Sequence, residues 1–197
     1  MNRTALLYTQ NQDELIRLGT RLRRIGFDII APHETAVRLK KAGINVVDID
    51  YLTSETAHSH LGETLHPMIY TALVAENNKA GNAILAESDF PRIDFIYANV
   101  CSLQSEVRID SHALEKVTEK LDIRGLAILL SAIKGRRIVM CQMDQMNFVL
   151  DEIKSSKFMK GGEVSMSFLS TLAGVAGREA ATICARIAHF YGHTMLQ

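Results

Sequence analysis

The chain has 197 residues, of which 47% are hydrophobic and 22% are charged, enough to fill the core of one compact domain. Its 22 Lys and Arg balance 22 Asp and Glu, and a net charge of zero argues against nucleic acid or an anionic membrane as a partner. Cys101, Cys141 and Cys184 are far apart and form no CxxC pair, which argues against a disulfide framework or a zinc site. The longest apolar stretch, 125–133, is about half of the ~20 residues that a membrane span needs. We therefore expect a soluble, cytoplasmic protein.

Short apolar runs alternate with amphipathic stretches in the first part of the chain. Helical spacing of Leu15, Leu18, Leu22 and Ile25 predicts a helix that Gly26 ends. The other elements expected here are strands at 5–9, 27–31 and 44–49 and a helix from 34 that Gly43 ends.

The rest of the chain begins with a polar stretch, 50–67, which predicts a long loop. The elements expected after it are helices at 68–77, 80–87, 111–120 and 126–134, strands at 93–100 and 136–142, and a helix to about 154 that Asp144 caps. Residues 155–163 read as a connection, and 164–196 read as one long helix or a broken pair.

The last segment carries an apolar stripe at spacings of three and four. Its members are Leu169, Leu172, Ala176, Ala180, Ile183, Ile187 and Phe190. Small residues around Gly177 would let another helix approach closely. This segment is expected to dock on the domain or on a partner subunit.

The β-α-β-α-β order predicts parallel strands joined by right-handed crossovers, with helices on both faces. The fold class is therefore α/β, a three-layer αβα architecture with a mainly parallel sheet. We expect one α/β domain at 1–154 and a helical extension packed on it at 155–197.

Four segments, in order along the chain, carry a resemblance to a known family. They are GFDIIAPHETAVRLKKAGINVVDI, TLHPMIYTALVA, RIDFIYANV and LDIRGLAILLSAIKG. The chain resembles the IMP cyclohydrolase domain of the bifunctional purine biosynthesis protein, whose fold is methylglyoxal-synthase-like. The resemblance covers essentially the whole chain and implies a stand-alone copy without the transformylase domain that normally follows.

The resemblance implies a hydrolase of the cyclic-amidine class that closes the ring of formamido-imidazole-carboxamide ribotide to give IMP. The carboxamide nitrogen attacks the formyl carbon and water leaves, without a metal or organic cofactor. The reaction needs a base for the amide nitrogen and donors for the developing oxyanion. It further implies a purine-precursor nucleotide as ligand, a homodimer, and a separate transformylase as partner.

The family's phosphate cradle is largely replaced in this chain. Where the family has Ser-x-Ser-x-Lys after its first strand, this chain has Tyr8-Thr9-Gln10-Asn11-Gln12. Where it has Ser-Thr-Gly-Gly-Thr after its second, this chain has Ala31-Pro32-His33-Glu34-Thr35, so only Thr35 is kept as a ligand-binding candidate. Glu34 either repels a phosphate dianion or merely complements the helix N-terminus.

The family's Arg-Val-Lys-Thr-Leu-His-Pro loop corresponds to 61–67. Its catalytic lysine becomes Glu63, whereas Thr64 and His66 remain. Glu63 and Thr64 are candidate ligand-binding residues. His66 is either a proton carrier near neutral pH or a structural hydrogen-bonding residue.

After the apolar strand, the family's Asn-Leu-Tyr becomes Asn99-Val100-Cys101. The tyrosine implicated in ring closure is therefore lost, and both Asn99 and Cys101 are candidate ligand-binding residues. A nucleophilic cysteine needs an activating cation, so Cys101 can equally be buried and inert.

Asp122, Arg124, Gly125 and Lys134 align with the family's Asp-Ile-Gly-Gly motif and the lysine of the helix after it. Asp122 is the candidate base and Lys134 its electrostatic partner, with Arg124 and Gly125 as ligand contacts. Alternatively, Asp122 caps a helix that Lys134 ends. No two histidines share a helix at ligand spacing, so no metal site is predicted.

Three hypotheses remain. The chain is a cyclohydrolase with a degenerate active site, or a non-catalytic regulatory or assembly subunit of the same fold, a pseudoenzyme. The third is an enzyme acting on a less anionic substrate. Like charges a few ångströms apart repel by on the order of one to a few kcal/mol near a surface, which favours the second and third where acids replace cations.

Overall fold

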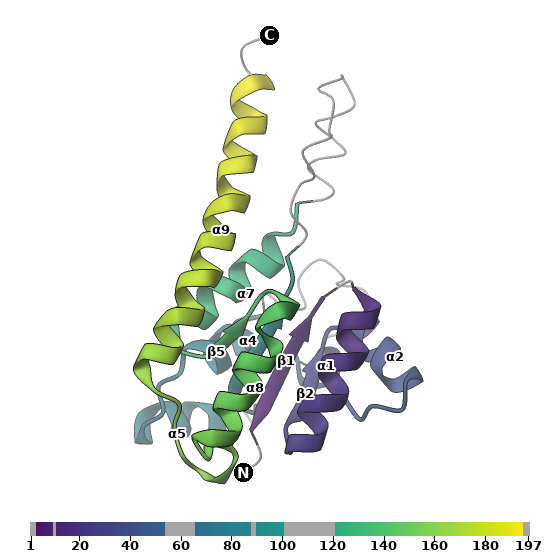
Figure 1. Cartoon of the computed structure of the whole chain (residues 1–197), viewed down its shortest axis with the longest axis vertical. Helices are drawn as coiled ribbons and strands as arrows, with labels where there is room; N and C mark the ends of the chain where they lie inside the picture. The colour runs from purple at the N-terminus through teal and green to yellow at the C-terminus, as the bar shows by residue number, and fades with distance from the viewer. Residues whose placement is uncertain (1–2, 10, 54–65, 88–89, 101–120, 195–197) are drawn as a thin grey trace.

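A five-stranded parallel sheet forms the centre of the protein, with the strand order β3-β2-β1-β4-β5 (Figure 1). The computed structural model describes residues 3–9, 11–53, 66–87, 90–100 and 121–194. The strands are β1 (Thr4–Tyr8), β2 (Asp28–Ala31), β3 (Val47–Asp48), β4 (Ile93–Ala98) and β5 (Ile138–Met140). The prediction of an α/β fold with a parallel sheet is confirmed.

Helices join and flank these strands. They are α1 (Gln12–Ile25), α2 (His33–Lys41), α3 (Ile49–Thr53), α4 (Pro67–Val74), α5 (Lys79–Glu87), α7 (Ile123–Lys134), α8 (Met146–Ser155) and α9 (Met166–Thr194), with short 3₁₀ turns η2 (Met143–Gln145) and η3 (Phe158–Lys160). None of the helices within the described ranges has the length and apolar character needed to cross a membrane.

The strand order reverses at β1. From β1 the chain moves outward through β2 to β3, and it then returns to place β4 on the other side of β1. Right-handed crossovers then put α1 and α2 on one face of the sheet and α4 and α7 on the other. The carboxyl ends of β1 and β4 are therefore a topological switch point, where open α/β sheets open a crevice for ligands.

The core lies between the sheet and its helices. All six residues of β4 are buried, as a strand covered on both faces should be. The apolar face predicted for the first helix is confirmed, because Leu15, Leu18 and Leu22 are fully buried. Gly26 ends that helix as expected.

Two predictions near the third strand and before α8 need correction. Residues 44–46 are not strand, and the chain turns into α3 at Ile49, so the predicted loop does not begin at Asp50. Its part at 54–65 and the helix predicted at 111–120 lie outside the described residues. Asp144 does not cap α8 but lies inside η2, which Gln142 caps in a reciprocal pair with Gln145.

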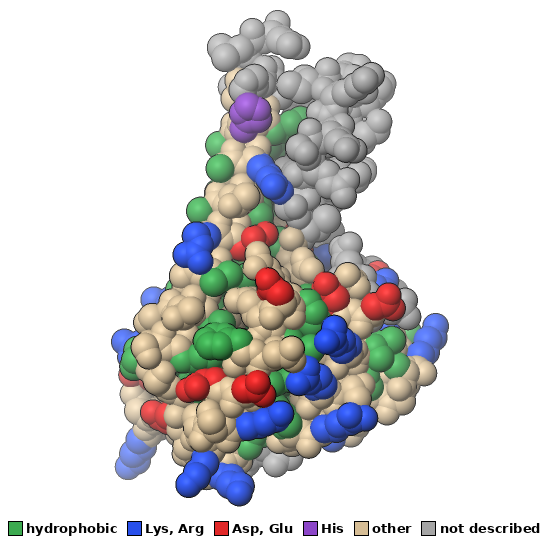
Figure 2. Space-filling model, viewed as in Figure 1, with side chains coloured by type: hydrophobic (Ala, Val, Ile, Leu, Met, Phe, Trp, Pro, Cys, Tyr) green, Lys and Arg blue, Asp and Glu red, His purple; other side chains and the backbone are tan. Residues whose placement is uncertain are grey.

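The C-terminal segment is one unbroken helix of 29 residues rather than a broken pair. Its predicted stripe is buried at Leu172, Ala176, Ala180 and Ile183, where α9 packs against α7 and β5. Figures 1 and 2 show that its C-terminal part extends beyond the α/β body. The division of the chain at residue 154 stays a prediction.

Gly135 sets how closely the ends of α4 and α7 approach, because a Cβ there would overlap the backbone of Leu73. Gly135→Ala is therefore expected to destabilise the fold by about 1–3 kcal/mol through overpacking. The free energy of unfolding from urea denaturation measures this. Gly177→Ala on α9, where nothing lies within 4 Å, is the matched control, and it should be neutral or stabilising. Equal effects of the two substitutions would contradict the packing argument.

Candidate functional site

The switch point brings together the first residues of the candidate site. Tyr8 ends β1 and lies in register with Ala98 of β4. One residue further on, the Asn99 backbone N–H donates to the Tyr8 carbonyl at 3.1 Å. The sequence motif had selected Asn99, and the structure places it beside Tyr8, which the motif had not selected.

Asp122 holds the N-terminus of α7 against this edge. Its Oδ1 accepts a hydrogen bond from the Tyr8 hydroxyl at 2.6 Å and another from the Gly125 backbone N–H at 2.9 Å. The second bond is the N-cap of α7, so the capping role considered for Asp122 is confirmed. The first is a contact that capping does not require. Oδ2 takes part in neither bond.

Gly125 is the residue that lets Tyr8 and Asp122 meet. A Cβ at this position would lie 2.7 Å from Asp122 Oδ2 and 2.9 Å from Tyr8 Cε1. Any larger residue would therefore push the tyrosine ring or the carboxylate away. The glycine thus serves the close approach of α7 to β1.

The Tyr8 hydroxyl stays protonated. Burial raises the pKa of Tyr8 well above its ordinary range, and the hydrogen bond to Asp122 adds to this. The Arg124 guanidinium acts in the opposite direction on the pKa of Tyr8, which places a cation next to the same hydroxyl. A proton donor, a carboxylate and a cation therefore meet at one point, the set that proton transfer to and from a substrate uses.

A second tyrosine–carboxylate pair, between β4 and α1, lies at the same carboxyl edge of the sheet. The fully buried Tyr97 donates its hydroxyl proton to Glu14 Oε2 of α1 at 2.5 Å, and the Asn99 amide donates to the same oxygen at 3.3 Å. Burial, followed by this bond to Glu14, raises the pKa of Tyr97. The amide of Asn99, predicted to contact a ligand, is thus turned toward Glu14.

A polar cluster joins the first residue of α2 to the end of β3 and the start of α3, where a glycine-rich loop would follow β2. His33 Nδ1 lies 2.7 Å from Asp48 Oδ2, and Asp48 Oδ1 accepts from the Asp50 backbone N–H at 3.1 Å. The donor atoms of His33, Asp48 and Asp50 lie within 4.8 Å of one another, a set that would suit a divalent cation and that the sequence had not suggested. Thr35, predicted to bind a ligand, is buried in the first turn of α2.

His66 begins α4 rather than standing free. Its Nδ1 accepts from the Met68 backbone N–H at 3.2 Å, and Pro67 takes the first position of the helix. This geometry is that of the structural alternative considered for His66, an N-cap. Glu63, Thr64 and Cys101 lie outside the described residues.

The structure does not bring Lys134 and Asp122 together. They lie at opposite ends of α7, whose 12 residues span about 18 Å at 1.5 Å per residue. Asp122 lies at the carboxyl edge of the sheet, and Lys134 lies by the amino end of β5. The predicted pairing of base and electrostatic partner is therefore wrong within one chain, and Arg124 is the cation that lies near Tyr8.

The hydroxyls of Tyr8 and Tyr97 should ionise at a higher pH than those of the exposed tyrosines. The chain has five tyrosines, and Tyr51 and Tyr70 are exposed. Because folding raises the pKa of Tyr8 and Tyr97, the unfolded chain loses these protons first as the pH passes 10.0, their ordinary value. The contribution of these two tyrosines to stability is therefore expected to be constant below that pH and to fall above it. Tyrosinate absorbance and thermal melting across pH 8–12 measure both effects. Tyr8→Phe and Tyr97→Phe should each reduce the alkaline loss, and an unchanged loss in both would contradict this.

Comparisons with known proteins agree with this architecture. A family profile described as "MGS-like domain" matches residues 14–127. The bifunctional purine biosynthesis protein PurH of Streptococcus mutans is 26% identical over 196 residues, which are 97% of this chain and 37% of that protein. PurH of Leuconostoc mesenteroides is 28% identical over 193 residues, 96% of this chain and again 37% of that protein. The chain thus spans little more than a third of these relatives.

A solved structure described as "Crystal structure of ForH" superposes with a TM-score of 0.82. It covers 97% of this chain and 100% of that chain at 24% sequence identity. At this identity the likeness shows the fold.

Proposed function

The chain belongs to the MGS-like domain family, and Tyr8, Asp122 and Arg124 meet at its switch point. From these two observations we propose that it is a cyclohydrolase of the IMP cyclohydrolase type. In this reaction a carboxamide nitrogen attacks a formamide carbon on the same ring, the formyl oxygen leaves as water, and a six-membered ring closes. The similarity to PurH over nearly the whole chain supports this reaction class.

The observation that carries the proposal is the hydrogen bond between Tyr8 and Asp122. Ring closure needs a base for the carboxamide proton and a donor for the formyl oxygen as negative charge develops on it. Asp122 has an oxygen, Oδ2, outside its bonds to Tyr8 and Gly125, and this atom serves as the base. Arg124, next to the Tyr8 hydroxyl, supplies positive charge for the oxyanion.

Tyr8 supplies the donor. Its hydroxyl keeps its proton at neutral pH, because burial and Asp122 raise its pKa. When the substrate displaces the Asp122 contact, this hydroxyl can turn to the formyl oxygen and assist its loss as water. A tyrosine on β1 would thus provide the phenol that the resemblance places at Cys101.

The polar cluster after β2 favours a second candidate, ring closure on a substrate without a phosphate dianion. Asp48 is buried, Glu34 lies in the first turn of α2, and His33 occupies the place of a cradle glycine. Acids at this position disfavour a phosphate, because like charges repel.

The experiment is to supply purified protein with the formamido ribotide and, separately, with its dephosphorylated riboside, and to follow ring closure by absorbance. Turnover of the ribotide above the uncatalysed rate supports the first candidate. A kcat/KM at least tenfold higher for the riboside supports the second. If neither compound is converted, both proposals fail, and the non-catalytic subunit is the remaining alternative.

A further inference from the structure

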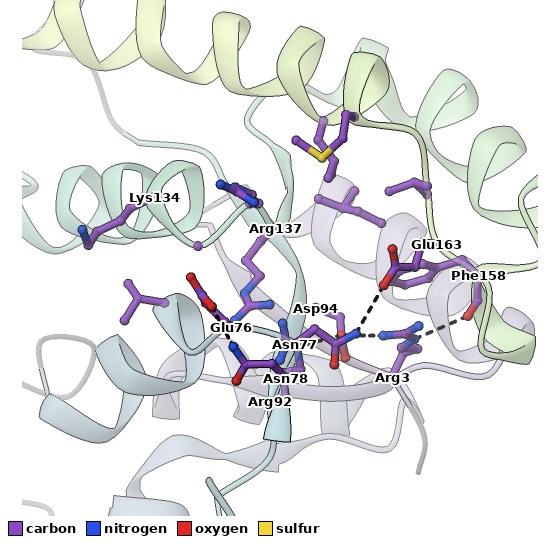
Figure 3. Close-up of a pocket in the computed structure, with 17 residues that line it drawn as sticks. Arg3, Glu76, Asn77, Asn78, Arg92, Asp94, Lys134, Arg137, Phe158 and Glu163 are labelled. Atoms are coloured by element: carbon purple, nitrogen blue, oxygen red, sulfur yellow. Dashed lines mark hydrogen bonds and ion pairs between the residues drawn. The ribbon is translucent and has the colours of Figure 1, made fainter. Parts of the chain in front are cut away.

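A cavity of about 560 Å³ opens at the amino edge of the sheet (Figure 3). Tyr8 and Asp122 lie at the opposite, carboxyl edge. The amino ends of β1, β4 and β5, the C-terminal ends of α4 and α7, and the chain from η3 into α9 surround it. The volume suits a ligand of nucleotide size. The reaction proposed above makes no use of this cavity.

The lining is cationic. Five Lys and Arg face three Asp and Glu, an excess of two positive charges in a chain whose net charge is zero. Two of the cations make hydrogen bonds within the cavity wall. Arg3 bonds to Asp94 and the Gly162 carbonyl, and Arg137 bonds to the last carbonyls of α4, which offsets the negative end of that helix.

Arg92 is the first of the three remaining cations. Its side chain is 17% exposed, and its Nε lies 3.6 Å from Asp94 Oδ1, an oxygen that Arg3 already holds at 3.0 Å. Within the part of the chain that the structure describes, its buried Nη1 has no hydrogen-bond partner. A buried guanidinium N–H without an acceptor is costly, so an anion that reached it would be stabilised.

Arg136 and Lys134 are the other two. Arg136 has a φ of 55°, in the left-handed region, although Gly135 directly before it has a φ of −81°. Glycine suits that conformation better than arginine, so the chain holds a cation at a strained position in the cavity wall. Lys134 is the exposed last residue of α7.

We propose that this cavity binds a small phosphorylated metabolite bearing hydroxyl groups, with its phosphate held by Arg92, Lys134 and Arg136. Glu76, Asn77 and Glu163 line the same cavity and offer oxygen acceptors to hydroxyl groups (Figure 3). Val164, Met166 and Leu169 form an apolar wall for a base or another non-polar group.

A ligand in this cavity would contact the same helix that carries the candidate base. Lys134 is the last residue of α7 and Asp122 is its N-cap, so an anion bound to Lys134 would restrain α7 from its C-terminal end. Binding itself is the claim that the experiment tests, and it stands whether or not ring closure is found.

The test is isothermal titration calorimetry of the purified chain with AMP, ribose 5-phosphate and adenosine at physiological salt. AMP and ribose 5-phosphate are expected to bind, and adenosine at least tenfold more weakly than AMP. Lys134→Met and Arg136→Gly should each weaken AMP binding at least fivefold. Arg136→Gly suits the backbone at that position, so it should fold normally. Lys41→Met, at the exposed C-terminal end of α2, is the matched control and should leave the affinity within twofold.

Any of the following results would overturn the proposal. The first is that neither phosphorylated compound binds. The second is that adenosine binds as well as AMP, or that Lys134→Met and Arg136→Gly leave the affinity unchanged. The third is that Asp122→Asn, at the opposite edge, weakens AMP binding while the two cavity variants do not, which would place the ligand at the switch point.

Discussion

Asp122→Asn is expected to lower the rate of ring closure at least a hundredfold while the protein stays folded. Asparagine caps helices as well as aspartate does, and it keeps an oxygen for the Gly125 N–H and the Tyr8 hydroxyl. It loses the ability to take a proton, and a positioned general base contributes roughly a hundredfold to ten-thousandfold. Single-turnover absorbance with the converted substrate measures the rate, and thermal melting checks the fold.

Two further variants make this result specific. Asp144→Asn changes an exposed carboxylate in η2, after β5, and should leave the rate unchanged. Tyr8→Phe removes only the hydroxyl and should lower the rate at least tenfold. If Asp122→Asn kept more than a third of the original rate, Asp122 would be only the cap of α7, and another base would have to be sought.

The spacing of apolar residues predicted the fold well, because a strand or helix that is buried against the core shows this in its own sequence. β4 is six consecutive buried residues, and the Leu15–Leu18–Leu22 face of α1 repeats at helical spacing. The signal was weakest where an element is short. Residues 44–49 are apolar enough for a strand, yet only Val47–Asp48 pair with β2, because the chain turns into α3 directly after them.

The sequence predicted the contacts of the candidate site only where both partners lie close together in the chain. Asp122 and Gly125 are three residues apart, and their hydrogen bond is local. Tyr8 and Asp122 are 114 residues apart, and Tyr97 and Glu14 are 83 apart, so no spacing could have paired them. A tyrosine at the carboxyl end of a predicted first strand was the one available hint, since ligands bind at that edge.

Lys134 shows the opposite error. The resemblance to the family suggested that it works with Asp122, but residues at the two ends of a helix lie far apart along its axis. A helix of 12 residues thus carries its two ends to opposite edges of the sheet. The sequence located both residues correctly on one helix, and only the strand order shows which end faces the switch point.

Arg137→Met is expected to destabilise the fold by about 3 kcal/mol, because a buried arginine holds the end of α4. Arg137 is 5% exposed and donates to the carbonyls of Leu73 at 2.6 Å, Ala75 at 2.5 Å and Ala72 at 3.3 Å. Burial lowers the pKa of Arg137 to about 10, so it is still a cation at neutral pH. Methionine preserves much of the stem but leaves helix-end carbonyls buried without donors, and each bond to a charged group contributes about 1.5–3 kcal/mol.

Urea denaturation of two further variants tests whether the guanidinium geometry, rather than charge alone, is responsible. Arg137→Lys keeps the charge but lacks the planar fork that reaches several carbonyls, so it should recover less than half of the lost free energy. Arg136→Gly alters the neighbouring arginine, which is exposed and in a left-handed conformation, and it should be neutral or stabilising by up to about 1 kcal/mol. A loss below about 1 kcal/mol in Arg137→Met, or full recovery by lysine, would mean that α4 is held mainly by apolar packing against α7. The two adjacent arginines would then differ in exposure without differing in structural role.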